Sequence, residues 1–357
     1  MKILAKRIMQ ALIIILVLCI FPVGCGSEET LQGTQGKDEE KKIQIGVTFD
    51  SFVIERWQRD RDVFVSMAKE LGADVNIQNA NGDVAEQKKQ IEYFIKKKMD
   101  VIVIVCIDSQ ALKTNIKKAK DAGVKVIAYD RLISDSDVDL YISFDNEKVG
   151  ELMGQALVDN GLVGGKVTMI NGSPKDNNVP MVCDGFKSVM EENGNEIVDS
   201  YYCDGWKAEL AGEYMYKNMD VVSECDAIMC GNDDLASRVV TALSEKRLAG
   251  KIMVVGQDAD LEACQRIVEG TQLMTVYKPI EKLAQRAAEC AVNLAKEEQI
   301  GTGENDLSTI SDGTYSIPYL KIDPVSVTKE NMDEVIINSG FHLKEDVYLN
   351  VPSQIEE

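Results

Sequence analysis

Trp57 stands among charged side chains at a point where a strand is expected to lead into a helix. The apolar run 43–47 is typical of a buried strand, and apolar residues recur at helical spacing from Asp62 to Leu71. In an open α/β sheet such a junction lies at the carboxyl edge, where ligands bind. An indole can stack on the C–H face of a flat polyhydroxylated molecule while arginine and aspartate bind its hydroxyls. A tryptophan that closes the core among solvated charges would explain this stretch equally well.

Other predicted strands also end in polar or aromatic residues. These are Asp130 and Arg131 after the strand 124–129, Asp204 to Trp206 after 197–202, Asn232 after 227–230, Asp258 after 252–255 and Lys278 after 273–277. Their position at carboxyl edges indicates a ligand site. Plainer roles exist, because Asp130 and Arg131 could form a local salt bridge, and Asn232 or Asp258 could cap a helix.

Strand-like and helix-like segments alternate along the chain with short connections, the pattern of a parallel sheet covered by helices. The part from about 42 to 351 is longer than one hydrophobic core usually supports, so two domains are expected. A first set of units ends at Asp145 and Asn146, and a second set in the same style follows it. The sequence therefore predicts an α/β fold with two doubly wound parallel-sheet lobes. Neither a G-x-G-x-x-G motif nor a P-loop follows a predicted strand, which argues against a nucleotide site.

Residues 1–24 have the features of an export signal. Basic residues precede an apolar run from Ala11 to Val23 that is too short for a comfortable transmembrane helix. Cys25 follows a glycine, as in bacterial lipoprotein signals, where the cysteine becomes lipidated, although Pro22 stands where leucine is usual. An ordinary secretory signal with a chance cysteine is the alternative. The polar stretch 25–42 is expected to be a flexible tether to the outer face of the membrane.

Charge and histidine content argue against several functions. The formal net charge of −20 leaves no basic tract to neutralise phosphates, which argues against nucleic-acid binding. His342 is the only histidine, so a histidine-based triad or metal cluster is not expected. No paired nucleophile and base stands out, and we expect a protein that is not an enzyme and carries no cofactor or metal.

Seven of the nine cysteines remain once Cys19 of the signal and Cys25 are set aside. That number is odd and no CxxC pair occurs, so neither a full disulfide set nor a zinc site is predicted, although one bridge is possible. Asp135, Asp137 and Asp139 alternate before a strand. They are expected to form a solvated acidic turn, because the glycine and distal glutamate of an EF-hand are missing.

Long blocks of the sequence resemble the periplasmic D-xylose-binding proteins, members of the type I sugar-binding proteins of ABC importers. The blocks are Glu55–Gln58 with Asp60–Asp62, Ala128–Arg131, Tyr141–Leu152, Gly172–Pro174 with Asp176–Asn178, Asp204–Trp206, Gly256–Leu261, Met274–Ile280 and Gly340–His342. The resemblance implies the type I periplasmic binding protein fold, with a three-segment hinge near residues 145–146, 278–279 and 312–318. The implied N-terminal lobe comprises 43–145 and 279–312, the C-terminal lobe 146–278 and 313–350, and a tail 351–357.

The resemblance also implies that two tryptophans sandwich the sugar ring, and Trp57 and Trp206 are the only tryptophans in the chain. The polar side chains implied to bind its hydroxyls are Arg59, Asp130 and Arg131 on the first lobe, with Asn178, Asn232, Asp258 and Lys278 from the second lobe and the crossing segment. Arg59 departs from the pattern of the family, because its better-known members have lysine at this position. Guanidinium and ammonium groups differ in hydrogen-bond geometry, so sugar preference or affinity would differ.

The function implied by the resemblance is that of a lipid-anchored, monomeric receptor outside the cytoplasm. It would capture a monosaccharide, with D-xylose as the expected ligand, and deliver it to an ABC permease. The same lobes would suit a sugar sensor that docks on a membrane histidine kinase, which is the alternative. A transcription repressor of the related fold would need an N-terminal helix-turn-helix where this chain has an export signal.

Overall fold

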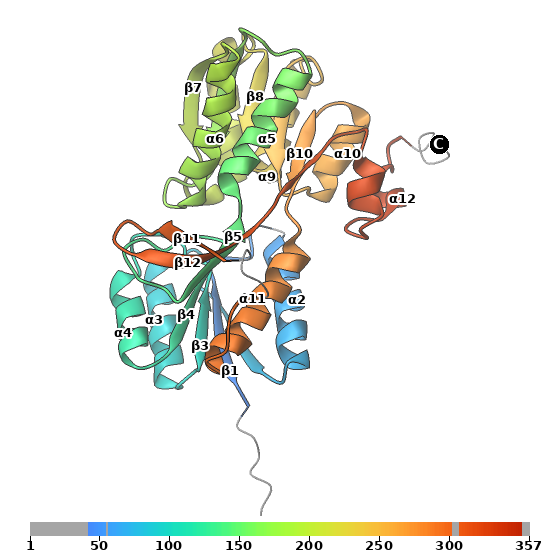
Figure 1. Ribbon diagram of the computed structural model, residues 1–357. Coiled ribbons are helices and arrows are strands. Elements are labelled where there is room, and N and C mark those ends of the chain that lie inside the picture. Colours follow the sequence, from blue (N-terminus) through green and yellow to red (C-terminus); the bar gives the residue numbers. More distant parts are fainter. Residues whose placement is uncertain (1–41, 55, 302–306, 352–357) are drawn as a thin grey trace, which may run out of the picture. The chain divides into compact units, whose positions relative to one another are not determined.

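The computed structural model describes residues 42–54, 56–301 and 307–351. Within these ranges the chain forms two α/β lobes, each built on one sheet (Figure 1). The predicted signal 1–24, the tether up to residue 41 with the lipidation candidate Cys25, and the tail from residue 352 lie outside the described residues. None of the helices in the described ranges has the length and apolar character needed to cross a membrane.

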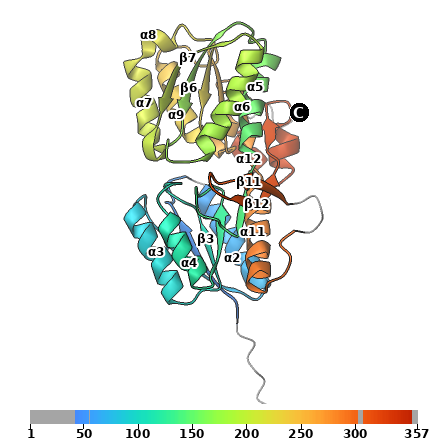
Figure 2. The same ribbon diagram turned by 60° about the vertical axis from the view of Figure 1, so that its left-hand side comes forward.

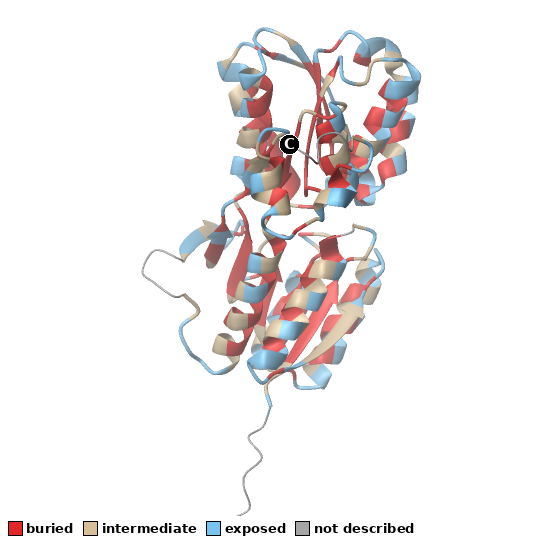
Figure 3. Cartoon of the chain, turned by 90° about the vertical axis from the view of Figure 1, so that its right-hand side faces the viewer, coloured by how far each residue is buried: buried red, intermediate tan, exposed pale blue. Residues whose placement is uncertain are grey.

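The N-terminal lobe contains a seven-stranded sheet. In spatial order its strands are β11 (Ser308–Ser311), β12 (Ser316–Ile322), β5 (Leu140–Phe144), β4 (Lys125–Tyr129), β3 (Val101–Ile104), β1 (Gln44–Phe49) and β2 (Asp74–Asn79). All neighbours are parallel except the hairpin β11–β12. Strands β3 and β5 are buried throughout, as expected for central parallel strands with helices on both faces (Figure 3).

Helices cover both faces of this sheet. They are α2 (Arg56–Glu70) and α11 (Ile280–Ala295) on one face, and α3 (Val84–Lys96) and α4 (Lys113–Asp121) on the other. Alternate strand residues face the two layers, since strand side chains point to opposite sides in turn. Val101 and Val103 of β3 belong to the same buried cluster as Phe64 of α2. Ile102 of the same strand belongs to the cluster that contains Phe94 of α3.

The C-terminal lobe contains a six-stranded sheet. In spatial order its strands are β13 (Val325–Val327), β10 (Met274–Tyr277), β9 (Met253–Gln257), β8 (Ala227–Cys230), β6 (Lys166–Asn171) and β7 (Glu196–Tyr202). Only β13 runs antiparallel to its neighbour. Its larger helices are α5 (Asn146–Asp159), α6 (Asn178–Glu192), α7 (Ala208–Lys217), α9 (Asp233–Glu245) and α10 (Leu261–Glu269). Short elements are η1 (Asp204–Trp206), α8 (Met219–Val222), η2 (Asp333–Ile337) and α12 (Lys344–Val347).

Figure 2 shows this sheet between the pair α5 and α6 and the pair α7 and α9. Helices α5 and α6 cross at unusually close range, because glycines stand at the crossing. A Cβ at Gly150 would lie 2.0 Å from the carbonyl oxygen of Val182, and one at Gly185 would lie 2.0 Å from that of Glu147. The close crossing fixes the N-terminus of α6, where Asn178 lies.

The first five strands of each lobe are parallel and have the same order, with the second strand outside the first and the third, fourth and fifth on the other side. This is β2-β1-β3-β4-β5 in one lobe and β7-β6-β8-β9-β10 in the other. The winding direction reverses beside the first strand of each lobe, and ligands bind outside the carboxyl ends of strands at such a switch point. The predicted fold class of two doubly wound lobes joined by three crossings is confirmed.

Three segments cross between the lobes. The first joins β5 to α5 and the second joins β10 to α11, as the sequence predicts. The third lies between Ile322 and Val325, and not at 312–318, because β12 still pairs with β5 in the N-terminal sheet. The boundary expected at 313 is therefore placed too early. Asp312 instead fixes the β11–β12 turn within the N-terminal lobe: its carboxylate accepts backbone N–H groups of 136, 137, 314 and 315.

The cysteines and the acidic run also have structural roles. All seven cysteines of the described part are buried and unpaired, so the disulfide left open by the sequence is not formed. In the acidic run, Asp137 pairs with Lys120 at 2.8 Å and Asp139 accepts the backbone N–H of Val126. Among the described residues no group of three or more His, Cys, Asp or Glu side chains is arranged to hold a metal.

Candidate functional site

A cavity lies at the facing carboxyl ends of the strands of both lobes, with about 500 Å³ of space between its lining atoms, part of it open to solvent. Eight of the nine predicted site residues line it: Trp57, Asp130, Arg131, Asn178, Trp206, Asn232, Asp258 and Lys278. Residues that the sequence reasoning did not assign line it as well, among them Arg56, Asn146, Gly172, Asp176 and Gln257.

Trp57 lies in the first turn of α2, directly after the loop that follows β1. Its indole is buried against Phe49, with ring centroids 6.2 Å apart, and the guanidinium carbon of Arg56 lies 4.4 Å from its ring centroid. The Trp57 Nε1 atom is buried and has no hydrogen-bond partner among the described residues. The indole therefore closes the core on one side and presents an unpaired donor at the cavity.

Trp206 ends the single turn η1 with a φ of 59°, a left-handed conformation that is rare for a bulky residue. Its ring covers Gly172, where a Cβ would lie only 2.1 Å from the indole. The Trp206 Nε1 atom donates to Asp176 Oδ2 at 3.1 Å. The glycine and the hydrogen bond together hold the ring against the end of β6, at the wall of the cavity.

Arg56 is buried at the same wall and contacts three carboxylates. Its Nε and Nη2 atoms each donate to Asp60 at 3.2 Å, and Nη2 lies 2.9 Å from Asp130 Oδ2. Its Nη1 atom lies 4.0 Å from Asp258 Oδ1, across the boundary between the lobes. Burial would lower the pKa of this guanidinium, but Asp130, Asp60 and Asp258 outweigh burial and raise the pKa. Arg56 is therefore a fixed cation of the site.

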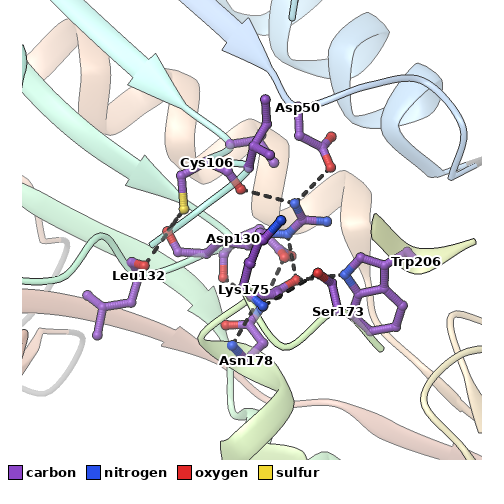
Figure 4. A network of polar contacts seen from close by, with 12 residues as sticks. Asp50, Cys106, Asp130, Leu132, Ser173, Lys175, Asn178 and Trp206 are labelled. Atoms are coloured by element: carbon purple, nitrogen blue, oxygen red, sulfur yellow. Dashed lines mark hydrogen bonds and ion pairs between the residues drawn. The ribbon is translucent and has the colours of Figure 1, made fainter. Parts of the chain in front are cut away.

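Arg131 joins the two lobes through a second buried network, which Figure 4 shows with Asp50 and Trp206 approaching from different sides. Its Nη1 atom donates to Asp50 at 2.7 Å in the N-terminal lobe. Its Nε atom lies 2.7 Å from Asp176 Oδ2 in the C-terminal lobe. Nearby, Asn178 Nδ2 donates to the carbonyl oxygen of Asp130 at 3.0 Å and lies 3.2 Å from its Oδ1 atom. The lobes thus contact one another through side chains of the cavity itself.

Lys278 and Asp258 form the third part of the wall. The ammonium group lies 2.6 Å from Asp258 Oδ1 and donates to Gln257 Oε1 at 3.0 Å. Asp258 has a φ of 99°, and Asp130 also lies in the left-handed region with a φ of 64°. Strained backbone of this kind clusters at functional sites. Asn232 combines both roles that its sequence position allows, because it caps α9 by accepting the Leu235 N–H at 3.0 Å and also lines the cavity.

Arg59 is the one predicted site residue that the structure places outside the cavity. Its guanidinium is partly exposed, lies 4.4 Å from the ring centroid of Phe341 and donates to the carbonyl oxygen of that residue at 3.0 Å. The reason is helix geometry: each residue turns the helix by about 100°, so position 59 lies about 160° from position 57. Position 60 lies about 60° and position 56 about 100° from position 57, so both lie nearer to Trp57 around the helix than position 59 does. The i, i+4 pair Arg56 and Asp60 was a signal in the sequence for this side of the helix.

The described part of the chain contains four buried side-chain polar atoms without a hydrogen-bond partner, and all four belong to residues of the cavity. They are Trp57 Nε1, Asp130 Oδ2, Arg131 Nε and Asp258 Oδ1. The last three lie near an opposite charge, but not in hydrogen-bond geometry. Buried polar atoms are nearly always paired in folded proteins. One unpaired donor and three atoms held only by charge, all in residues of one cavity, are suited to a ligand with several hydroxyl groups, which donate and accept at once.

The charges of the cavity lining balance. Three cations line it, namely Arg56, Arg131 and Lys278, against three carboxylates, namely Asp130, Asp176 and Asp258. Burial would raise the pKa of Asp130, but Arg56 and the other two cations outweigh it and lower the pKa. Burial does raise the pKa of Asp176, in spite of Arg131. A balanced lining favours an uncharged ligand over an anion or a cation.

Comparison with known proteins identifies the family. The family model of the periplasmic binding protein domain matches residues 45–299. The D-xylose-binding periplasmic protein of Haemophilus influenzae is 43% identical over 313 residues, which are 86% of this chain and 93% of that protein. The protein of the same name from Escherichia coli is 41% identical over 314 residues, with the same shares. The chain belongs to the periplasmic binding protein family.

Solved structures agree with the fold of this periplasmic binding protein. A carbohydrate transporter solute-binding protein from Chloroflexus aurantiacus, in complex with D-glucose, has a TM-score of 0.78 and 27% identity and covers 85% of this chain and 98% of its own. An ABC transporter solute-binding protein from Clostridium phytofermentans with bound β-D-glucose has a TM-score of 0.75. The periplasmic binding protein has the type I sugar-binding fold and is a binding protein, not an enzyme, and the family implies export from the cytoplasm.

Proposed function

We propose that this protein captures a neutral aldose, D-xylose, in the cavity between its lobes. The observation that carries the proposal is the set of four buried polar atoms without a hydrogen-bond partner in residues of a charge-balanced cavity lined by both tryptophans of the chain. The choice of D-xylose is supported by two relatives of that name at 43% and 41% identity.

In this proposal Trp57 and Trp206 lie against the two faces of the sugar ring. Ring C–H groups gain from contact with an aromatic face, and both indoles are already held in place by packing. Asp130 Oδ2 and Asp258 Oδ1 would accept sugar hydroxyls, and Trp57 Nε1 and the guanidinium group of Arg131 would donate to sugar oxygens. Hydrogen bonds to charged partners are the stronger ones, so these carboxylates and the guanidinium would dominate orientation.

Arg56 takes the place proposed from the sequence for Arg59, because it is the arginine of α2 that lines the cavity. Asn178, Asn232 and Lys278 complete the polar wall. These groups come from both lobes, so only the closed arrangement offers all of them to the sugar. The ligand therefore favours closure through its greater affinity for the closed form.

We further propose that the closed, loaded form delivers the sugar to an ABC permease, as a monomer anchored through lipid on Cys25. The family membership and the ABC-transporter neighbours support the transport role, and the sequence around Cys25 supports the anchor. Changing Cys25 to alanine should release the protein from the membrane into the medium. Pull-down from solubilised membranes should recover a permease, and recovery of a histidine kinase instead would contradict the transport role.

Isothermal titration calorimetry of the exported domain against D-xylose, D-ribose, L-arabinose and D-glucose tests the ligand. We expect D-xylose to bind most tightly, with a dissociation constant of about 1 μM or lower, the range of roughly −8 kcal/mol. Trp206→Ala should abolish most of this binding while the circular dichroism spectrum stays unchanged. Absence of heat and of any thermal shift with all four sugars would overturn the proposal.

A further inference from the structure

Arg59, although it lies outside the cavity, connects the helix that carries Arg56 and Trp57 to the C-terminal part of the chain. Its Nη2 atom donates to the carbonyl oxygen of Phe341 at 3.0 Å, and its guanidinium lies over the ring of that residue. Its Nη1 atom also lies 3.5 Å from Glu281 at the start of α11, directly after the second crossing. Arg59 thus contacts Phe341 near the C-terminus and also Glu281, which lies next to the second crossing in the N-terminal lobe.

Phe341 belongs to a segment that packs on the C-terminal lobe. After β13 the chain stays with that lobe, where α12 packs against α10 (Figure 1). Two side-chain hydrogen bonds fasten it, from Gln265 to the carbonyl oxygen of Asp346 and from Asn350 to Glu269. The Arg59–Phe341 contact is therefore a contact between the lobes.

The same segment also touches the backbone beside a proposed sugar residue. The Nε2 atom of His342 lies 2.8 Å from the carbonyl oxygen of Ala259, next in sequence to Asp258. Asp258 and Ala259 both have positive φ, 99° and 54°. Two consecutive non-glycine residues in this region store strain and persist only where neighbours hold them. The 341–342 segment is such a neighbour.

We infer that Arg59 is a positioning residue: with Phe341 and His342 it forms a latch that holds the closed arrangement and the Asp258 turn without touching the sugar. The inference rests on the proposed function, because closure matters here through sugar binding. A contact that is strongest in the closed form slows opening and has little effect on the encounter of sugar with the open form. The latch should therefore act on the dissociation rate and not on the association rate.

The guanidinium group is needed for this role. It donates to a carbonyl, faces a carboxylate and stacks on a ring at the same time, and an ammonium group cannot do all three. Arg59→Lys should therefore keep part of the effect and Arg59→Ala none of it. Arg61 provides a matched control on the same helix: it is also partly exposed, pairs with the adjacent Asp62 and lies over the ring of Phe52, all within the N-terminal lobe.

Stopped-flow fluorescence is a suitable test, because the chain contains only two tryptophans and both line the cavity. For Arg59→Ala we expect D-xylose to dissociate roughly five to ten times faster, in keeping with one lost charge-assisted hydrogen bond at a partly exposed site. The association rate and the affinity ranking of the four sugars should stay as in the wild type. The dissociation rate of Arg59→Lys should lie between those of the wild type and Arg59→Ala. The dissociation rate of Arg61→Ala should equal that of the wild type.

Hydrogen exchange without sugar gives a second measurement that does not depend on the ligand. Amides of residues 258–260 and 340–342 should exchange faster in Arg59→Ala than in Arg61→Ala, while the melting temperatures stay similar. A dissociation rate within twofold of the wild type, or exchange equal in both variants, would overturn the latch. A changed affinity ranking of the four sugars would also overturn the latch, since it would mean that Arg59 contacts the sugar directly. A wild type that binds no aldose would overturn the proposed function, and the exchange comparison would still decide the latch.

Discussion

Arg131 of the N-terminal lobe and Asp176 of the C-terminal lobe form a buried ion pair, with Nε and Oδ2 2.7 Å apart. The same oxygen accepts the indole N–H of Trp206 at 3.1 Å. Closing the lobes therefore brings an arginine of one lobe to the carboxylate that positions a tryptophan of the other. Closure and the proposed sugar contacts are coupled through this one oxygen.

Asp176→Asn should weaken sugar binding. The amide can still accept from Trp206, but it removes the charge that faces Arg131, which keeps only Asp50 as a carboxylate partner. Breaking a buried charged contact costs about 1.5–3 kcal/mol, which corresponds to roughly a tenfold to hundredfold loss of affinity. Calorimetry with D-xylose measures this loss of affinity. An affinity equal to that of the wild type would show that the Arg131–Asp176 ion pair does not support closure.

Gly172→Ala should disturb Trp206 without changing any polar group. The new methyl would lie 2.1 Å from the indole ring, so the ring must move away from its place at the cavity wall. Overpacking of this kind costs about 1–3 kcal/mol, and we expect most of it as lost sugar affinity. Gly212→Ala in α7 is the control, because its methyl would meet nothing closer than 3.7 Å. Equal affinities and melting temperatures for the two variants would contradict the assigned position of Trp206.

Arg56→Lys should reduce affinity more than Arg59→Lys. An ammonium group cannot hold both oxygens of Asp60 and face Asp130 at the same time, so Asp130 would lose its fixed cation. We expect roughly a hundredfold loss for Arg56→Lys, on the scale of two charged hydrogen bonds. Calorimetry with D-xylose measures the affinity of both variants. A larger loss for Arg59→Lys than for Arg56→Lys would indicate that Arg59, not Arg56, contacts the sugar.

Asp233, buried behind Asn232 at the start of α9, should make stability depend on pH. Burial raises the pKa of its carboxyl from 3.8 to about 7, against the lowering effects of Arg266, Thr275 and Gln272. The unfolded chain releases this proton at lower pH than the folded protein does. The stability that the group contributes is therefore fully present below about pH 4 and is lost as the pH rises through 7, by about 4 kcal/mol at most.

Urea unfolding of the wild type and of Asp233→Asn between pH 4 and 8 isolates this group, because all other titrations are shared. The variant should lose less stability than the wild type over this interval. Parallel pH profiles for the two proteins would mean that Asp233 is already ionised at low pH in the folded state.

Much of the fold and of the cavity could be predicted from local patterns. Strand ends are visible as apolar runs followed by polar residues, and parallel strands bring their carboxyl ends to one edge, so eight of nine predicted residues lie together. Both tryptophans stand at such ends. Whether each contacts a sugar stays a prediction, because the pattern places the side chain and does not show its ligand.

The misplaced features depend on information that is not local. Arg56 and Arg59 lie about 60° apart around α2, and contacts with distant residues distinguish them: Arg56 faces Asp130 and Asp258, whereas Arg59 contacts Phe341. The third crossing depends on β12 pairing with β5, whose residues lie about 180 positions earlier, as Tyr141 does for Tyr319. The carboxylate of Asp312 binds the loop at 136–137, equally far away in sequence. Neither contact leaves a periodic signal in the sequence.

A crystal structure of the exported domain grown with D-xylose tests the central claim most directly. We predict one pyranose ring between the indoles of Trp57 and Trp206, with hydroxyls within hydrogen-bond distance of Asp130 Oδ2 and Asp258 Oδ1. A sugar bound elsewhere, or an occupied cavity in which neither oxygen accepts a sugar hydroxyl, would contradict the account.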